Sequence, residues 1–269
     1  MPSSDPIRIM VGAAANGEDA ESQAVLEYTL RRHCSRPIEI TWMRLSRDPA
    51  SPFYSDRGKG WNTRAWSTPF SGFRWAVPAL CNFEGRAIYM DSDMIVMADI
   101  GELWDMEMRP GAIIASATGG KHNRFDVALW DCAGAQGVVA AIEWQRVAPH
   151  AHRTMIQRMQ TRRDLVHELP AGWNCLDGEG FARLDDPAVK VIHYTKMSTQ
   201  PHLPRAKSRM AQRGEAHWYD GRTSAHPNKA LQDLFDVRLG EATRAGYAPE
   251  RYEPETGFGP YLKKSYAHR

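Results

Sequence analysis

The first part of the chain alternates in a regular order between apolar runs and polar or small residues. Ile7–Val11 is a short apolar run of the kind that forms a buried strand, and small residues fill positions 12–17. Residues 21–32 place apolar side chains at helical spacing, and Ile38–Met43 alternates between apolar and polar positions. A strand, a helix and a second strand in this order predict a βαβ unit, and therefore an α/β domain with a parallel sheet.

Further segments continue this pattern. A helix is predicted over residues 70–82, although Pro78 must kink or shorten it because proline lacks a backbone N–H. Residues 47–66 have no period and are predicted to form a long loop, and residues 200–229 are rich in proline and basic side chains. The other predicted strands are 86–90, 112–115, 127–129 and 189–193, and the other predicted helices are 135–144, 153–162 and 229–245.

The nearly balanced charge limits the expected partners. The chain has 34 basic and 32 acidic residues and a formal net charge of +2, so neither nucleic acid nor an anionic membrane surface is favoured. No apolar segment approaches the roughly 18 residues of a membrane span, and the polar start lacks the pattern of a signal peptide. We therefore expect a cytoplasmic protein. The cysteines are scattered singly, which disfavours a zinc site or a disulfide framework.

The central candidate for chemistry is an Asp-x-Asp pair at the end of a predicted strand. Asp91 and Asp93 follow the apolar run 86–90 and precede a second apolar run. Side chains two positions apart in an extended segment point the same way, so both carboxylates can reach one ion. A divalent cation removes their mutual repulsion, and hard oxygen ligands suit Mg²⁺ or Mn²⁺. A solvated turn holding two acids is an equally weighted alternative.

Two other polar side chains are candidates for the same site. His193 ends the predicted strand 189–193, and a neutral imidazole would complete a mixed nitrogen and oxygen site that favours Mn²⁺. Arg74 lies on the helix before the acidic pair, where a guanidinium can hold phosphate or sugar oxygens. A packed core histidine and an ordinary surface arginine are the simpler interpretations of each residue taken alone.

A mixture of aromatic, amide and carboxylate side chains occupies residues 169–178. Such mixtures bind sugars, because a ring face packs on Trp173 while hydroxyls hydrogen-bond to Asn174 and Asp177. A structural turn with Trp173 buried in the core is the alternative, and the pattern does not decide between them.

Taken in order, these segments resemble the family 8 glycosyltransferases, which include glycogenin and bacterial lipopolysaccharide galactosyltransferases. The chain is most similar to short bacterial members of unassigned substrate. Each motif is weak by itself, but their order along residues 7–203 is fairly specific. The matching segments are Gly12–Asn16, Phe73–Trp75, Tyr89–Asp93, Asp99–Trp104, Leu169–Asn174 and Ile192–Tyr194.

The resemblance implies a GT-A fold, in which a Rossmann-like sheet flanked by helices binds a nucleotide at the carboxyl ends of its strands. Residues 1–203 would form the catalytic part, and residues 204–269 a C-terminal extension whose terminal helix packs on the same domain. The resemblance also implies Mn²⁺ or Mg²⁺ held by Asp91, Asp93 and His193. It implies that Gly12–Asn16 and Arg74 contact the donor. The full set of expected donor-binding residues is Gly12, Ala13, Ala14, Asn16, Arg74, Ser92, Trp173, Asn174 and Lys196.

The expected donor is a UDP-sugar, and the expected reaction is a retaining hexosyl transfer to a glycan, lipid-linked or protein acceptor. The cation and Arg74 would stabilise charge on the leaving diphosphate. Retention proceeds either through a covalent carboxylate intermediate or by front-face attack within an ion pair. Asp126 and Asp177 are the candidate catalytic carboxylates.

The chain departs from the family pattern in two places. Better-known members have an aspartate in the first loop that meets the uracil or ribose, but here Ala13–Ala15 leave only Asn16 and Glu18 as polar groups. Those members also carry Lys-Pro-Trp after the His-Tyr pair, whereas this chain has Gln200-Pro201-His202. We expect Lys196 or Lys207 to replace the missing cationic group.

Two other functions fit parts of the pattern. Residues 90–93 resemble the strand-end motif of magnesium-dependent haloacid-dehalogenase phosphatases, although those enzymes carry it on their first strand. The altered first loop also fits a catalytically inactive relic that binds a sugar or nucleotide without turnover.

Overall fold

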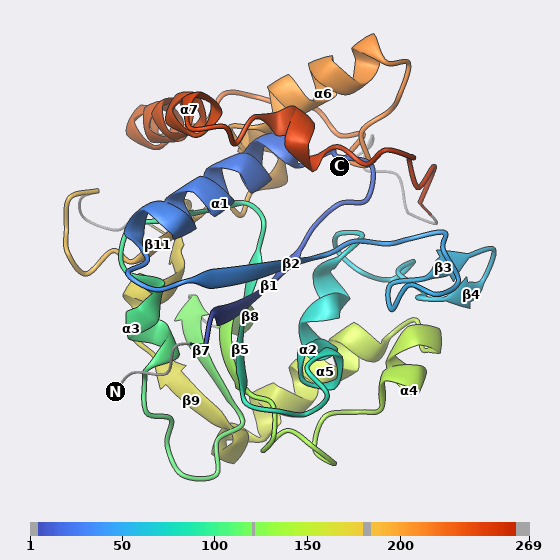
Figure 1. Ribbon diagram of the computed structural model, residues 1–269, viewed down its shortest axis with the longest axis vertical. Helices are drawn as coiled ribbons and strands as arrows, with labels where there is room; N and C mark the ends of the chain where they lie inside the picture. Colours follow the sequence, from blue (N-terminus) through green and yellow to red (C-terminus); the bar gives the residue numbers. More distant parts are fainter. Residues whose placement is uncertain (1–4, 120–121, 180–183, 262–269) are drawn as a thin grey trace.

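A six-stranded mixed sheet forms the centre of the molecule (Figure 1). The computed structural model describes residues 5–119, 122–179 and 184–261. The strand order is β2-β1-β5-β8-β7-β9, in which β8 runs antiparallel to both neighbours and the other adjacent pairs are parallel. The strands are β1 (Ile7–Gly12), β2 (Ile38–Met43), β5 (Arg86–Asp91), β7 (Ile114–Gly119), β8 (His122–Asp131) and β9 (Val166–Leu169). The predicted mixed, mainly parallel α/β class is confirmed.

Helices flank this sheet, and two smaller sheets complete the fold. In Figure 1, α1 lies along one side of the sheet with α7 beyond it, whereas α2 and α5 lie toward the other side. The α-helices are α1 (Ala20–His33), α2 (Val77–Leu80), α3 (Ile100–Trp104), α4 (Ile142–Val147), α5 (Ala151–Thr161), α6 (Leu203–Gln212) and α7 (Lys229–Arg244). The 3-10 helices are η1 (Ser71–Trp75), η2 (Arg163–Leu165), η3 (Ala171–Asn174), η4 (Met197–Thr199) and η5 (Pro249–Tyr252). The smaller sheets contain β10 (Cys175–Leu176), β11 (Val191–His193) and β6 (Met94–Val96), and β3 (Ser55–Asp56) and β4 (Lys59–Gly60).

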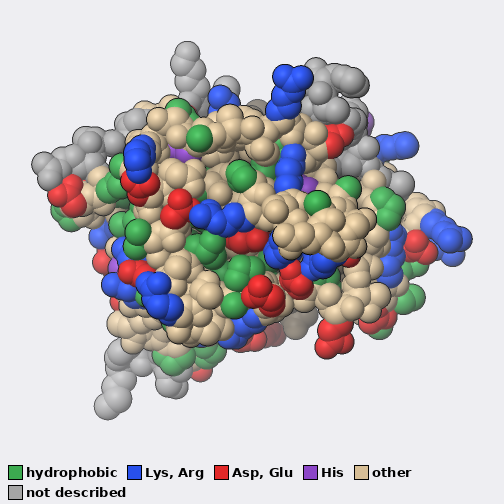
Figure 2. Space-filling view, turned by 90° about the horizontal axis from the view of Figure 1, so that it is seen from above, with side chains coloured by type: hydrophobic (Ala, Val, Ile, Leu, Met, Phe, Trp, Pro, Cys, Tyr) green, Lys and Arg blue, Asp and Glu red, His purple; other side chains and the backbone are tan. Residues whose placement is uncertain are grey.

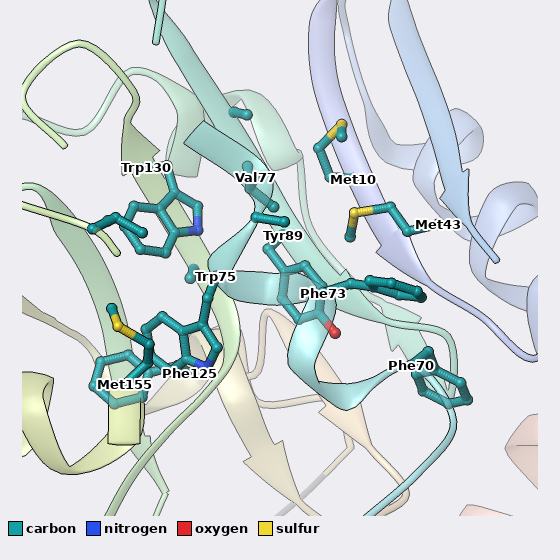
Figure 3. Close-up of a cluster of buried hydrophobic side chains, with 14 of the residues drawn as sticks. Met10, Met43, Phe70, Phe73, Trp75, Val77, Tyr89, Phe125, Trp130 and Met155 are labelled. Carbon is teal, nitrogen blue, oxygen red and sulfur yellow. The ribbon is translucent and has the colours of Figure 1, made fainter. Parts of the chain in front are cut away.

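The alternation along the central strands divides the core into two clusters. Ile9 and Val11 of β1 face a cluster that includes Leu26 of α1, because successive side chains of a strand point to opposite faces. Met10 and Tyr89 face the other cluster, which is rich in aromatic rings (Figure 3). Both faces of the central strands are therefore buried, as expected for a parallel sheet covered by helices.

The predicted loop 47–66 contains the short paired strands β3 and β4, and three further differences from the sequence-based expectation concern helices. The helix predicted over 70–82 is divided into η1 and α2, and Pro78 lies in the first turn of α2, where its missing N–H costs no hydrogen bond. The helix predicted over 135–144 begins only at Ile142. In the proline-rich stretch 200–229, for which no helix was predicted, α6 forms with Pro204 in its first turn.

Charged side chains of both signs are interspersed on the face that Figure 2 views from above. This mixture agrees with the balanced composition and leaves no broad field of one sign on that face. None of the helices in the described ranges combines the length and apolar character that a membrane span requires.

Candidate active site

Three charged groups meet at the carboxyl end of β5, and two of them, Arg74 and Asp126, are buried. Asp91 is the last residue of β5, and Asp126 lies on the neighbouring β8, where Val127 pairs with Met90. Arg74 of η1 bridges the two acids: Nη1 donates to Asp126 Oδ1 at 2.6 Å, and Nη2 donates to Asp91 Oδ1 at 3.0 Å. Buried charges are tolerated when they are paired in this way. Arg74, which is only 4% exposed, is therefore part of the site rather than a surface residue.

The backbone turns sharply just before Asp126. Phe125 has a φ of 59°, in the left-handed region that few non-glycine residues adopt. The pairing of β8 with β7 changes register over the same stretch, between the pairs Ser116–Ala128 and Thr118–Asn123. Irregularities of this kind redirect side chains and are common beside functional sites.

His193 reaches the same place from the small sheet. It ends β11, and its Nε2 lies 3.2 Å from Asp93 Oδ1. On the other side of the ring, Nδ1 lies 2.9 Å from Asn174 Oδ1, an acceptor, so the hydrogen is on Nδ1. Nε2 is thereby directed toward Asp93, whereas Asp126 Oδ2 lies 3.6 Å from Nδ1. A second partner usually orients a metal-binding histidine in this way. The predicted convergence of His193 with the acidic pair is present in the structure.

The acids and the imidazole form a group that suits a divalent cation. One ligand atom each from Asp91, Asp126 and His193 lie within 4.8 Å of one another. Asp93 Oδ1 and Asp126 Oδ2 are buried and accept no well-formed hydrogen bond from a described residue, although each has a nitrogen of His193 or Arg124 beside it. Carboxylate oxygens with one imidazole nitrogen suit Mn²⁺ or Mg²⁺.

The composition of this group differs in one residue from the expected ligand set. Asp126, which was expected as a catalytic carboxylate, lies with Asp91 and His193. Asp93 contacts His193 and also accepts a hydrogen bond from Gln200 Nε2. Its assignment as a ligand stays a prediction.

The proton affinities in the group reflect crowded negative charge. Burial raises the pKa of Asp91 to about 6, although Arg74 opposes the shift. Burial also raises the pKa of Asp126, but Arg74, His193 and Arg124 outweigh it and hold that pKa well below its ordinary value. For His193 burial lowers the pKa, and Asp93 and Asp126 reverse this to a net increase. The group thus attracts positive charge, either as protons or as a cation.

The first loop is joined to the acidic pair by a residue that was not predicted. Asp19, just before α1, accepts a hydrogen bond from Ala14 N at 3.1 Å and from Ser92 Oγ at 2.6 Å with the same carboxylate oxygen. Gly12 at the end of β1 is closely packed, since a Cβ there would lie 2.7 Å from Tyr89 Oη. The only sequence signal for Asp19 is an acid at a predicted helix start, which is an ordinary capping pattern.

The C-terminal part of the chain also contacts this loop. Ala15 N donates to Tyr261 Oη at 2.7 Å, and the Asn16 side chain exchanges two hydrogen bonds with the backbone of Gly259. The loop that was expected to hold the base and ribose is therefore bordered by residues about 245 positions away in sequence.

The other predicted site residues have different surroundings. Asp177 accepts hydrogen bonds from Thr195 N and Oγ1, at 3.0 and 2.8 Å, and its second oxygen lies 3.2 Å from His226 Nε2. Trp173 is packed in the core cluster that contains β1 and is 3% exposed. Lys196 is exposed, and Lys207 Nζ donates to Gly221 O at 2.6 Å.

Several solved structures superpose on this chain over most of its length. The chain superposes on the bifunctional glycosyltransferase WbbM with a TM-score of 0.57 at 15% identity, covering 91% of this chain and 52% of that one. For GlyE of Streptococcus pneumoniae the TM-score is 0.54 at 14% identity, with 94% and 66% covered. For the galactosyltransferase LgtC, solved with donor and acceptor sugar analogs, it is 0.52 at 11% identity, with 87% and 96% covered. The chain has a GT-A fold. It spans about half the length of WbbM.

Sequence relatives of this GT-A chain are distant. It is 26% identical to Protein CDI of Arabidopsis thaliana over 212 residues, which cover 71% of this chain and 78% of that protein. A shorter match to general stress protein A of Bacillus subtilis is 37% identical over 55 residues, 20% of this chain and 19% of that protein. No family model matches the chain.

Proposed function

We propose that this protein is a glycosyltransferase that binds a nucleoside-diphosphate sugar through a divalent cation. The observation that carries the proposal is the convergence of Asp91, Asp126 and His193 at the carboxyl edge of a GT-A sheet. Ligands of α/β proteins bind at this edge. The finer assignment, a retaining hexosyltransferase of family 8 that uses a UDP-sugar and Mn²⁺, follows from the ordered motifs and is part of the same proposal.

Each of these residues would have a separate role in the proposed reaction. Asp91, Asp126 and His193 would hold the cation, with Asp93 beside them, and the cation would supply Lewis-acid stabilisation of the leaving diphosphate. Arg74 fixes the two acids from the protein side and adds positive charge. Asn174 keeps the His193 ring in the required orientation.

The surroundings of the candidate nucleophiles favour front-face attack. Arg74 and Arg124 hold Asp126, while Thr195 and His226 hold Asp177. A carboxylate that is already paired is a weak nucleophile, so neither is well suited to form a covalent intermediate. We therefore favour attack within an ion pair, and the paired carboxylates act by position and charge.

The test is nucleotide binding and turnover with and without Mn²⁺. Isothermal titration with UDP, UDP-glucose and UDP-galactose should show binding that depends on Mn²⁺, and sugar nucleotides should release UDP slowly by hydrolysis or transfer. Asp126→Asn and His193→Gln should each lose the Mn²⁺ dependence, whereas the exposed control Asp105→Asn should not. Circular dichroism checks that each variant is folded.

Unchanged Mn²⁺-dependent binding in folded Asp126→Asn and His193→Gln proteins would reject the metal assignment. Tight binding without any UDP release would instead support the inactive relic, which the altered first loop favours.

A further inference from the structure

A small pocket lined mainly by polar and charged residues opens beside the cation group. Its volume is about 280 Å³, just below the roughly 300–1,000 Å³ of drug-sized ligand sites, which suits a ligand such as one sugar ring. Arg74, Asp91 and Asp126 form one part of its wall. The rest of the lining comes from the segment before η1, from the first residue of η1, from β8 and from α5. It consists of Ser67, Thr68, Ser71, Arg124, His152, Ile156 and Gln160.

Two hydroxyls in this pocket lack partners. Thr68 Oγ1 and Ser71 Oγ are buried, and neither has a hydrogen-bond partner among the described residues. Native proteins leave few buried polar groups unsatisfied, because each costs desolvation free energy without compensation. Both residues line the pocket, so rotation of either side chain would offer its unused hydroxyl to a polar ligand that both donates and accepts hydrogen bonds.

His152 on α5 presents a donor of fixed orientation to the same pocket. Trp75 Nε1 donates to His152 Nδ1 at 2.9 Å, so the ring hydrogen is on Nε2. The indoles of Trp66 and Trp75 lie beside the imidazole, at centroid distances of 6.2 and 6.4 Å. Burial, together with the positive charge of Arg74, lowers the pKa of His152 to about 3, so the ring stays neutral near pH 7.

We propose that this pocket holds the hexose ring of the donor and that His152 recognises one of its hydroxyls by donating from Nε2. The inference rests on the proposed function, because it places the sugar next to the cation group that would hold the diphosphate. The lining supports a sugar: Thr68, Ser71 and Gln160 can each both donate and accept, as sugar hydroxyls do. An acceptor sugar has the same chemistry, and the test separates the two.

Two variants of His152 separate recognition from packing. In His152→Asn the side-chain oxygen lies near the position of Nδ1, so the bond from Trp75 is kept and the distal donor is lost. In His152→Gln the side-chain amide reaches the position of Nε2, so the distal donor is kept. The probes are UDP, UDP-glucose and UDP-galactose, each titrated with Mn²⁺ by calorimetry.

We expect His152→Asn to bind UDP like the wild type but to bind the preferred UDP-sugar about tenfold more weakly, as for the loss of one hydrogen bond. His152→Gln should retain most of the wild-type affinity. Equal weakening of UDP and UDP-sugar, or no selective effect at all, would overturn the inference while leaving the proposed function intact. Wild-type protein that binds none of the three nucleotides would reject both.

The acceptor arm uses methyl glucoside and methyl galactoside, titrated into protein loaded with UDP and Mn²⁺. If His152→Asn weakens binding of these glycosides and leaves UDP-sugar binding unchanged, the pocket holds the acceptor, and the assignment to the donor hexose is wrong.

Discussion

Arg74 is the residue on which the geometry of the candidate site depends. Its guanidinium bridges Asp91 and Asp126, its Nε donates to Ser71 O at 2.8 Å, and it lies 5.1 Å from the centroid of the Tyr89 ring. These contacts connect three elements, η1, β5 and β8, through the guanidinium of Arg74. In the proposed function the residue would therefore contribute to folding and to the arrangement of the cation group through the same bonds.

Replacement of Arg74 by methionine should destabilise the protein by about 3–5 kcal/mol, because two buried acids lose their counter-charge. Without Arg74 the pKa values of both acids are higher than in the wild type, so protonation relieves more of the loss at low pH and the deficit should shrink as the pH falls from 7 to 5. Urea unfolding at both pH values measures it. The exposed control Arg162→Met breaks a surface pair with Asp164 and should change stability by less than about 1 kcal/mol. A deficit that is the same at both pH values would contradict this account.

Glu18 gives the protein a separate pH dependence. Burial raises its pKa to about 7, although hydrogen bonds from Asn16 oppose the shift. An acid whose folded pKa is raised stabilises the fold fully below its unfolded pKa, and this contribution is lost as the pH rises through about 7. Between pH 5 and pH 8, wild-type protein should therefore lose on the order of 2–3 kcal/mol relative to Glu18→Gln, which cannot ionise. Thermal or urea unfolding of both proteins at the two pH values tests this, with exposed Glu84→Gln as the control. Parallel pH profiles for wild type and Glu18→Gln would refute it.

At the scale of elements, the position of η1 depends on close packing at Gly72. A Cβ at this position would lie 2.3 Å from the Trp66 ring, so Gly72→Ala must displace either the ring or η1. We expect a destabilisation of about 1–3 kcal/mol and weaker Mn²⁺ binding, because η1 carries Arg74. Gly178→Ala, where a Cβ meets nothing within 4 Å, is the matched control and should be nearly neutral. Urea unfolding and Mn²⁺ titration measure the two effects, and wild-type behaviour in both would show that the packing is not restrictive.

Local sequence patterns were sufficient to predict the helices and strands whose apolar and polar residues alternate regularly. β1, α1 and β2 follow from apolar periodicity, and Asp91 follows from its place at the end of an apolar run. Helix 70–82 was wrong as one element, because the chain forms η1 and then a separate short helix with Pro78 in its first turn, whereas Pro78 was expected to kink or shorten a single helix. α6 was missed because its first-turn proline and basic residues resemble a loop in composition.

The site could be predicted only in part, because its assembly is non-local. His193 and the acidic pair were expected together from motif order. In the structure His193 contacts Asp93, and its ligand atom lies within 4.8 Å of one from Asp91. The place of Asp126 depends on the antiparallel pairing of β5 with β8 and on the backbone turn at Phe125, which no periodicity reveals. The pocket beside it needs α5 to pack against η1, a contact that composition does not encode.

At the scale of the whole molecule, the C-terminal residues are tied to the start of the chain. Arg209 of α6 donates to Glu21 of α1, to Glu253 and to the backbone oxygen of Gly17. α1 also packs along α7 (Figure 1). These contacts support the prediction that residues 204–269 belong to the same domain as residues 1–203.

Arg209→Met should therefore lower the stability of the whole protein by on the order of 2 kcal/mol, since Glu21 is left buried without its partner. Adding Glu21→Gln should recover part of the loss, as expected for two residues in contact. When unfolding is monitored by tryptophan fluorescence and by circular dichroism, the two signals should still change in one coincident transition. Arg205→Met, which removes an exposed pair with Asp236, is the control. Two separate transitions in the wild type would show that the C-terminal extension folds independently.

The hydrogen bond from Ala15 to Tyr261 has a consequence for how the protein is made. A ribosome synthesises Ala15 246 residues before Tyr261, so the first loop lacks this partner while the residues between them are being made. Prematurely terminated products that end before Tyr261 would carry every residue of the cation group and yet present an unfinished loop.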